Sequence, residues 1–285
     1  HLRLFASVPE IHALLGQIYE QMGNHTDAIC HLENAVALAP HLLDALFTLG
    51  VAHQMSGNHL CAIDLFNQVI EAAPTLPHTY RYRGLALQEL GREAEAKVSF
   101  EQALALNPEY PEAMGSLAHL LMKHSPFGAA ETLLLRALEL KPAMNDVQNS
   151  LARLYQLEGK SEEASAMFEG VFRAEPDNRL ALSNYLYSLC YLDSVPPEET
   201  AAKHISLCER YFPVVDNPKS FQKRHHFSEE RRLRIGYLSN DFCLHSVSFF
   251  LEPVLINHDR SRFEIFCYSN RTAADETTLR IRSLD

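Results

Sequence analysis

Residues 240–245 carry the side chains with the clearest capacity for chemistry: an amide, a carboxylate and an imidazole. Asn240, Asp241 and His245 directly follow residues 233–239, whose apolar alternation is typical of a β-strand. An imidazole, with an ordinary pKa of about 6.5, can accept a proton at neutral pH. The carboxylate of Asp241 could orient the imidazole or the loop. His245 could equally be a structural histidine that only bonds within the loop, so both interpretations stay open on these residues alone.

A β-α-β arrangement would position this loop. Residues 263–269 are typical of a second strand, and the segment from Ser246 to about Asn257 is typical of a helix with a strongly apolar face. Another helix is expected from near Asp275. Ligands of open α/β sheets bind beyond the carboxyl ends of the strands, here the first loop and residues 269–271. Neither stretch contains a GxGxxG or P-loop pattern, so a nucleotide site is not predicted from them.

Residues 9–178 differ from the β-α-β segment in that one sequence pattern recurs every 34 residues. Each unit has a small residue in each helix, a large apolar residue beside them and a closing proline. The closing prolines are Pro40, Pro74, Pro108, Pro142 and Pro176. Small residues let two helix axes approach closely, and proline ends each unit because it cannot continue a helix. The pattern resembles the tetratricopeptide repeat, a helix-turn-helix unit that buries its apolar face by stacking on its neighbours.

The sequence therefore predicts a mainly α protein, a right-handed tetratricopeptide-repeat α-solenoid followed by an incomplete α/β, Rossmann-like segment. We expect the end of a preceding helix at 1–8, five repeats at 9–178, atypical capping helices at 179–211, a linker at 212–232 and a truncated β-α-β part of a lobe at 233–285. Two strands are too few for a stable doubly wound domain, so we expect the domain to continue beyond Asp285.

The concave face of such a solenoid is the second candidate site, because stacked helix pairs make an extended surface suited to peptides. The inward positions of the first helices that we expect to contact acceptor or partner proteins are Gln17, Phe47, Arg81, His119, Asn149 and Arg153. Exposed solenoid ends could also join two copies, so a homo-oligomer stays open.

Composition argues against several classes of protein. The formal net charge of −11 provides no basic footprint, so no nucleic-acid partner is expected. The sequence has no apolar run long enough for a membrane span, so no membrane partner is expected. Cys30 and Cys61, each among apolar neighbours, are expected to be buried thiols of a reducing compartment, which favours the cytoplasm. No pair of histidines shows metal-ligand spacing on one helix face, so no metal is expected.

Residues 233–270, LRIGYLSNDFCLHSVSFFLEPVLINHDRSRFEIFCYSN, resemble the start of the catalytic region of O-linked N-acetylglucosamine transferases. They are most similar to the bacterial relatives of the SPINDLY type. Residues 183–213, SNYLYSLCYLDSVPPEETAAKHISLCERYFP, are similar to the helices that those proteins place between repeats and catalytic region. With the repeats, the resemblance covers essentially the whole chain.

This resemblance implies an inverting, GT-B-like glycosyltransferase of two Rossmann-like lobes. Such an enzyme moves a sugar, typically N-acetylglucosamine from UDP-GlcNAc, onto Ser or Thr of acceptor proteins without a required metal. GDP-fucose is a possible donor, because some plant relatives use it. His245 matches an active-site histidine discussed as a general base in the family, and Asp241 could orient the loop or the imidazole. The family's donor residues lie mainly in the second lobe, so cofactor-binding residues are expected beyond Asp285. The 285-residue chain is therefore expected to be inactive alone.

The sequence departs from the family at two places. Ser246 stands where the family often has proline, and it could be a helix N-cap. The animal enzymes line their groove with an asparagine ladder, whereas the column here reads Leu14, Thr48, Tyr82, Ser116, Ser150 and Asn184. A partner must therefore be held differently. The alternative function is a non-catalytic tetratricopeptide-repeat scaffold for protein–protein interaction.

Overall fold

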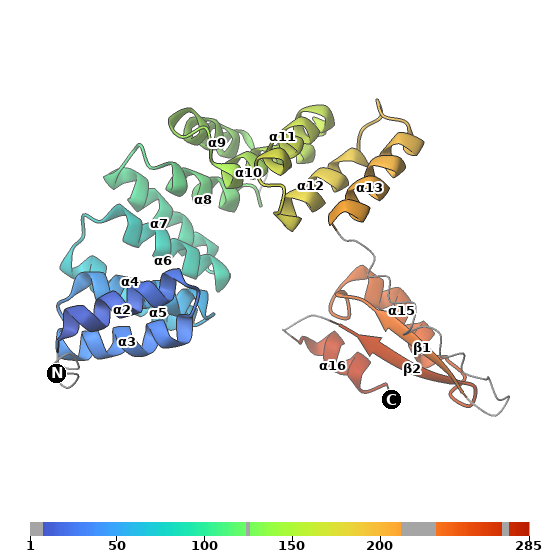
Figure 1. Ribbon diagram of the computed structural model, residues 1–285, viewed down its shortest axis with the longest axis horizontal. Coiled ribbons are helices and arrows are strands. Elements are labelled where there is room, and N and C mark those ends of the chain that lie inside the picture. Colours follow the sequence, from blue (N-terminus) through green and yellow to red (C-terminus); the bar gives the residue numbers. More distant parts are fainter. Residues whose placement is uncertain (1–7, 124–125, 212–231, 270–273, 285) are drawn as a thin grey trace. The chain divides into compact units, whose positions relative to one another are not determined.

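A computed structural model describes residues 8–123, 126–211, 232–269 and 274–284. The chain divides into two compact units, His1–Pro213 and Val214–Asp285. The described part of the first unit is helical, and the second unit combines two strands with helices (Figure 1). The expected end of a preceding helix and nearly all of the expected linker lie outside the described residues.

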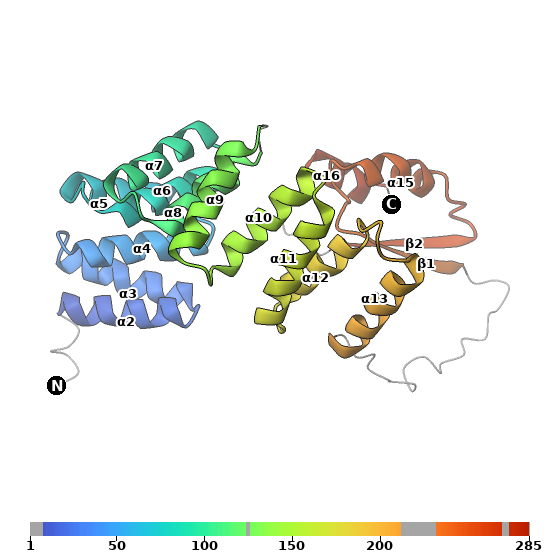
Figure 2. The same cartoon turned by 90° about the horizontal axis from the view of Figure 1, so that it is seen from above.

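Successive helices of the first unit pack as pairs, and each pair packs on the next (Figure 2). The paired helices are α2 (Pro9–Gln21) with α3 (His25–Leu38), α4 (Leu43–Met55) with α5 (His59–Ala72), α6 (Pro77–Glu89) with α7 (Glu93–Leu106), α8 (Pro111–Leu121) with α9 (Gly128–Leu140), and α10 (Asn145–Leu157) with α11 (Ser161–Ala174). They are followed by α12 (Arg179–Leu189) and α13 (Pro197–Tyr211).

The turn inside a repeat takes a backbone conformation that favours glycine. Gly23, Gly57, Gly91 and Gly159 have φ between +73° and +81°, in the left-handed region. An added Cβ would meet no atom within 4 Å at any of them, so the constraint is backbone conformation rather than space. These glycines therefore fix where the first helix ends. In the fourth repeat, positions 124–125 lie outside the described residues.

A second set of glycines sets how closely the two helices of a repeat approach. A Cβ added at Gly50 or Gly84 would lie 2.6 or 2.5 Å from the ring of Phe66 or Phe100. Both rings are fully buried, so neither can move aside freely. In the fourth repeat, Ala118 takes the glycine position and a leucine takes the position of the phenylalanine. The first repeat has glycine opposite a leucine, Gly16 opposite Leu32, so the small residue keeps the helices close but does not follow the size of the residue that it faces.

The core of the first unit is shared between repeats rather than enclosed within each one. Phe66, Phe100 and Leu117 belong to one buried cluster although they come from three different repeats. Ala35 and Leu49 likewise join the first two repeats. Because each repeat completes the core of its neighbour, the predicted mainly helical solenoid is confirmed.

The second unit is a small α/β arrangement. Its elements are β1 (Leu233–Leu238), α15 (Ser246–Ile256), β2 (Phe263–Tyr268) and α16 (Glu276–Arg282). The two strands pair in parallel, with Leu233 opposite Phe263. Phe242, Leu255 and Ile281 form the buried cluster beneath them. This arrangement agrees with the expected β-α-β start of an α/β segment.

The expectation that Cys30 and Cys61 are buried is wrong, because both are exposed. On α3 the buried face is formed by Ala28, Leu32 and Ala35, at helical spacing, and Cys30 falls between these positions. Apolar neighbours in sequence therefore do not place a residue on the apolar face.

Candidate functional site

The first helices of successive repeats lie next to one another and form a continuous face. Between α6, α8 and α10 this face is hollowed into a groove pocket of about 240 Å³. The pocket is lined by Arg81, Leu85, Gln88, Glu112, Gly115, Ser116, His119, Asp146, Val147 and Ser150. Two of the six groove residues expected from the sequence, Arg81 and His119, therefore lie in one pocket.

Arg81 is held across the gap between two repeats. Its Nε donates to the backbone carbonyl of Glu112 at 3.1 Å and to the Oγ of Ser116 at 3.2 Å. Its guanidinium carbon lies 5.4 Å from the centroid of the Tyr82 ring, a cation–π contact. Arg81 is thus an oriented cation on the pocket wall and not a loose surface charge.

His119 is biased toward its neutral form. Burial lowers the pKa of His119, and the positive charges of Arg153 and Lys123 lower it further, while Glu89 acts in the opposite direction. A neutral imidazole carries one donor and one acceptor nitrogen. The pocket therefore offers a fixed cation and a neutral hydrogen-bonding ring side by side.

The other four expected groove residues have different surroundings. The ring of Phe47 makes an edge contact with His78 at 4.7 Å between centroids, so it takes part in the stacking of repeats. Gln17 is partly exposed and Arg153 is exposed. Asn149 is partly exposed, but its Oδ1 is buried and has no hydrogen-bond partner among the described residues.

Serine or threonine hydroxyls stand at three positions of the column where an asparagine ladder was considered. Thr48, Ser116 and Ser150 each donate to the carbonyl four residues earlier in their own helix, at 2.8, 2.8 and 2.9 Å. Their protons are therefore already used. Only hydroxyl lone pairs remain for a ligand at these three positions.

The loop after β1 is ordered by its own polar groups. The N–H of Asp241 donates to the Oγ of Ser239 at 3.0 Å, and the Oγ of Ser248 donates to the carbonyl of Asp241. These bonds tie Asp241 to the end of β1 and to the first turn of α15. The carboxylate is thus held beside the N-terminus of that helix.

His245 is itself the N-cap of α15. Its Nδ1 accepts the backbone N–H of Val247 at 3.3 Å. The expectation that Ser246 caps this helix is therefore wrong, since an imidazole nitrogen one residue earlier fills the role that a hydroxyl usually fills.

The structure brings Asp241 and His245 together, with 3.7 Å between Oδ2 and Nδ1, and leaves each side chain nearly half exposed. One nitrogen cannot both accept from Val247 and donate to Asp241. When Nδ1 caps the helix, the neutral ring carries its proton on Nε2 and acts there as a donor. When Nδ1–H faces Asp241, Nε2 is free to accept a proton.

Two residues that were not chosen as site residues from the sequence hold this loop against α16. Asp275 accepts the backbone N–H of Thr278 through Oδ1 and that of Leu244 through Oδ2, each at 2.8 Å. The Oγ1 of Thr278 donates to the carbonyl of Phe242 at 2.6 Å. The capping box is visible in the sequence as Asp-x-x-Thr. Its bond to Leu244 is not, because it joins residues 31 positions apart.

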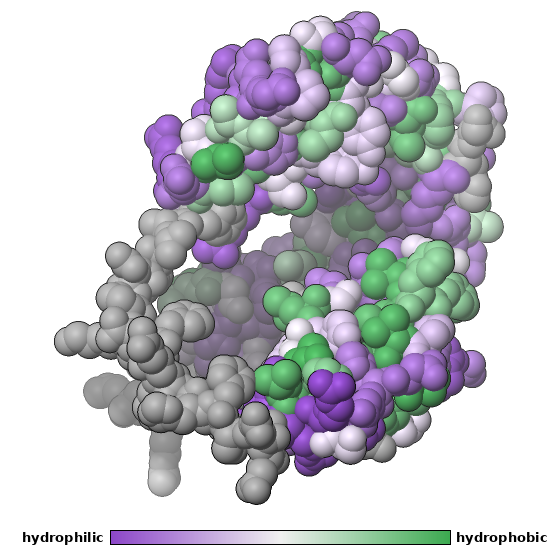
Figure 3. Space-filling model, turned by 90° about the vertical axis from the view of Figure 1, so that its right-hand side faces the viewer, coloured by the Kyte–Doolittle hydropathy of each residue, from purple (hydrophilic) through white to green (hydrophobic). Residues whose placement is uncertain are grey.

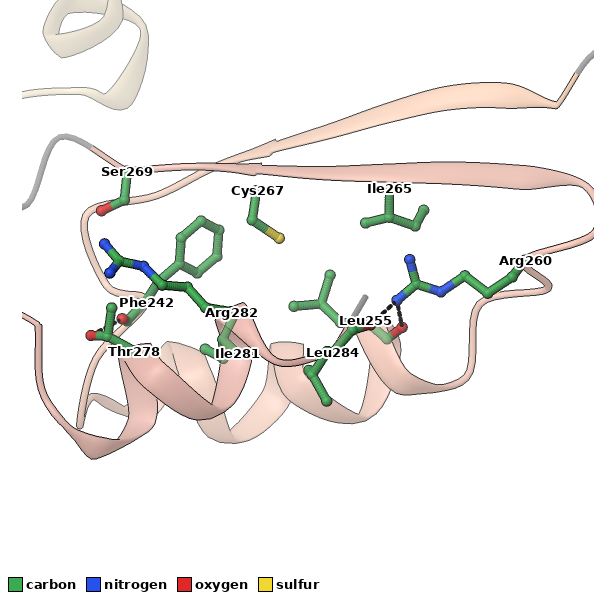
Figure 4. Close-up of a pocket in the computed structure, with 10 residues that line it drawn as sticks. All are labelled: Phe242, Leu255, Arg260, Ile265, Cys267, Ser269, Thr278, Ile281, Arg282 and Leu284. Carbon is green, nitrogen blue, oxygen red and sulfur yellow. Dashed lines mark hydrogen bonds between the residues drawn. The ribbon is translucent and has the colours of Figure 1, made fainter.

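A cavity of about 350 Å³ lies between the strands and the helices of the second unit. Figure 4 shows Arg260 at one end, where its Nη2 donates to the carbonyls of Leu255 and Leu284 at 3.3 and 2.7 Å. Arg282 lies at the other end, near Ser269 (Figure 4). Neither member of the candidate catalytic pair lines this cavity, so loop and cavity are separate features.

Hydrophobic side chains reach the surface of each of the two units (Figure 3). Within the described ranges, no group of three or more His, Cys, Asp or Glu side chains is arranged to hold a metal ion. Among the helices that the structure describes, none combines the length and apolar character needed to cross a membrane.

Family models match both parts of the chain. Residues 177–284 match the glycosyl transferase family 41 model, a span that begins just before α12 and includes β1 to α16. Residues 8–75, 77–110 and 146–178 match tetratricopeptide-repeat models. The expected combination of repeats with part of a glycosyl transferase region is confirmed.

Known proteins agree with these matches. The chain is 33% identical over 121 residues to a probable UDP-N-acetylglucosamine–peptide N-acetylglucosaminyltransferase SPINDLY of Oryza sativa subsp. japonica, which is 40% of this chain and 12% of that protein. It is 42% identical over 72 residues to a UDP-N-acetylglucosamine–peptide N-acetylglucosaminyltransferase of Caenorhabditis elegans, which is 24% of this chain and 6% of that protein. These alignments thus span about an eighth or less of the relatives' length.

A solved structure of a thermophilic TPR protein from Thermus thermophilus aligns with this chain at a TM-score of 0.57. The alignment covers 64% of this chain and all of that protein, with 20% sequence identity. It supports the fold of the repeats.

Proposed function

Since tetratricopeptide repeats precede part of a family 41 glycosyl transferase region in this chain, we propose that it is the N-terminal part of a protein O-glycosyltransferase. The observation that carries the proposal is the family match over residues 177–284, which includes the ordered loop with Asp241 and His245. The full-length enzyme transfers a sugar to Ser or Thr of acceptor proteins. The donor is a nucleotide sugar: UDP-GlcNAc is the main candidate and GDP-fucose is the alternative.

In this proposal the repeats form a right-handed solenoid that presents acceptor or partner proteins, and the second unit belongs to the first of two Rossmann-like lobes. The reaction inverts the sugar stereochemistry and takes place in the cytoplasm. Donor binding is proposed to lie outside these 285 residues, because the resemblance to the family places the donor residues mainly in the second lobe. The 285-residue chain alone therefore transfers no sugar.

His245 acts on the acceptor hydroxyl or on the donor, and its two hydrogen-bonding states give it two distinct roles. With Nδ1 on the Val247 N–H, the Nε2–H donates and stabilises developing negative charge. With Nδ1–H on Asp241, Nε2 accepts a proton as a general base. The 3.7 Å separation from Asp241 allows the second state after a small rotation of the ring.

Transfer assays on the full-length protein distinguish these roles. His245→Ala should lower kcat for transfer from UDP-GlcNAc by about 100-fold or more, as expected for a general acid–base group. Asp241→Asn should lower it about as much only if His245 works as a base. His41→Ala, which removes an exposed histidine of the first unit, is the control and should leave the rate unchanged.

Equal transfer by wild type and His245→Ala would remove this histidine from the mechanism. No transfer by the full-length wild type with either donor would refute the enzyme and leave the interaction scaffold.

A further inference from the structure

Three glutamines occupy the same position of three first helices. Gln54 in α4, Gln88 in α6 and Gln156 in α10 are separated by multiples of the 34-residue period. Each is partly exposed, yet each has one amide atom that is buried without a hydrogen-bond partner among the described residues. The atoms are Oε1 of Gln54, Oε1 of Gln88 and Nε2 of Gln156. We call these three residues the glutamine row.

Unpaired buried amide atoms are uncommon in folded proteins and call for an explanation. Burial of a polar atom without a partner costs free energy, and that cost is repeated here at equivalent positions. A methionine, Met122, fills the same position in the fourth repeat and is almost completely buried. The site therefore accepts an apolar side chain of similar length, so packing alone does not require an amide.

The glutamine row lies on the groove side of the solenoid. Gln88 lines the groove pocket together with Arg81 and His119. Gln54 and Gln156 take the same place by the repeat period. Helix α4 contacts α6, whereas α6 and α10 each contact α8, the first helix of the repeat that has Met122 at this position. Asn149, another groove position, also has a buried amide oxygen without a partner in the described part of the chain.

An amide side chain both donates and accepts, as a peptide backbone does. The neighbouring hydroxyls cannot match it, because Ser116 and Ser150 spend their protons on their own helices. Packed helices lie about 8–10 Å apart, and an extended chain rises about 3.3 Å per residue. A segment that crosses the first helices would therefore pass Gln54 and Gln88 about three residues apart, and Gln156 about six residues after Gln88, because the repeat with Met122 lies between them.

We propose that the glutamine row binds an extended segment of a partner protein through its backbone, largely independently of sequence. The side-chain amides turn toward the segment, and their unpaired atoms then gain partners. This inference rests on the proposed function in one respect, that a protein partner enters the groove. It adds which groups hold that partner and what they recognise.

The chain provides a matched pair of substitutions. Gln88→Met removes one amide and copies the fourth repeat, whereas Met122→Gln adds an amide at the position between Gln88 and Gln156. The probe is a fluorescein-labelled 15-residue peptide of Ser, Thr, Ala and Gly, tested by fluorescence anisotropy against the full-length protein. The same peptide with N-methylated backbone amides is the control ligand. Urea unfolding is measured on each variant without peptide.

Gln88→Met should weaken peptide binding at least threefold and unfold at a higher urea concentration, because it loses an unpaired buried amide. Met122→Gln should tighten binding at least threefold and unfold at a lower urea concentration. The N-methylated peptide should bind more weakly to wild type and show no difference among the variants. Opposite changes in affinity and stability would not follow from a purely structural role of the glutamines.

Equal affinities for wild type and both variants would overturn the proposal, and so would undetectable binding by wild type or undiminished binding of the N-methylated peptide. The two proposals fail separately. If the variants shift binding as expected but the full-length protein transfers no sugar, the enzyme assignment fails alone. If sugar is transferred and the variants bind alike, the glutamine row fails alone.

Discussion

The bond between Asp275 and Leu244 makes a quantitative prediction about the loop that carries His245. Asp275→Asn keeps one acceptor oxygen for the helix cap, because asparagine caps a helix about as well as aspartate. It should lose the bond to Leu244, and a hydrogen bond to a charged group is worth about 1.5–3 kcal/mol. Asp275→Ala loses that bond and also the cap on Thr278, typically about 1 kcal/mol.

Hydrogen exchange at single backbone amides measures both losses. A change of 1.36 kcal/mol in local opening is about tenfold in exchange rate, so the Leu244 amide should exchange about 10- to 150-fold faster in both variants. The Thr278 amide should exchange about fivefold faster in Asp275→Ala and almost normally in Asp275→Asn. The amide of Val171, in the buried face of α11, serves as the internal control.

Unchanged protection of Leu244 in Asp275→Ala would refute the reasoning, because the loop would then be held by groups other than this carboxylate. Faster exchange at Thr278 in both variants would show instead that asparagine cannot keep the cap.

Two further predictions concern the repeats. Gly84→Ala should destabilise the chain by up to about 2 kcal/mol in urea unfolding, since overpacking against the buried Phe100 ring costs about 1–3 kcal/mol and the helix gains about 1 kcal/mol from alanine. Adding Phe100→Leu, which copies the fourth repeat, should recover part of the loss; a more stable Gly84→Ala would contradict the packing. Burial lowers the pKa of His119 in the folded state, so the unfolded chain binds more protons there and stability declines as pH falls below about 6.5. His119→Gln should flatten the difference between unfolding at pH 7.5 and pH 5, and an unchanged difference would show that this imidazole is not the source.

The repeat architecture was predictable because its determinants are local and recur. Gly50 and Gly84 fall where a Cβ would meet a neighbouring ring, and such a constraint repeats at every period of 34 residues. The strand–helix–strand order after residue 232 was predictable for the same reason, since periodicity changes where the elements change. The prediction that the thiols are buried was wrong, because the neighbours of Cys30 in the sequence do not show which face of α3 it occupies.

The hydrogen bonds of the candidate site could not be predicted from the preferences of single residue types for helix caps. Ser246 was the better N-cap by residue type, but the imidazole of His245 reaches the same backbone N–H. Asp275 could be predicted as a cap, whereas its second bond depends on how the chain returns to the loop. The buried amide atoms of the glutamine row also became visible only with side-chain positions, because glutamine on a helix is ordinarily a surface residue.

The carboxylate that secures Leu244 follows it by 31 residues. At a synthesis rate of about 5–20 residues per second, the ribosome adds those residues in roughly 2–6 seconds. During that interval the nascent loop has only its own short-range hydrogen bonds. The hydrogen bond that ties Leu244, next to His245, to the start of α16 cannot yet form. A chain halted before residue 275 would therefore carry the complete loop sequence but lack the contact that holds it in place.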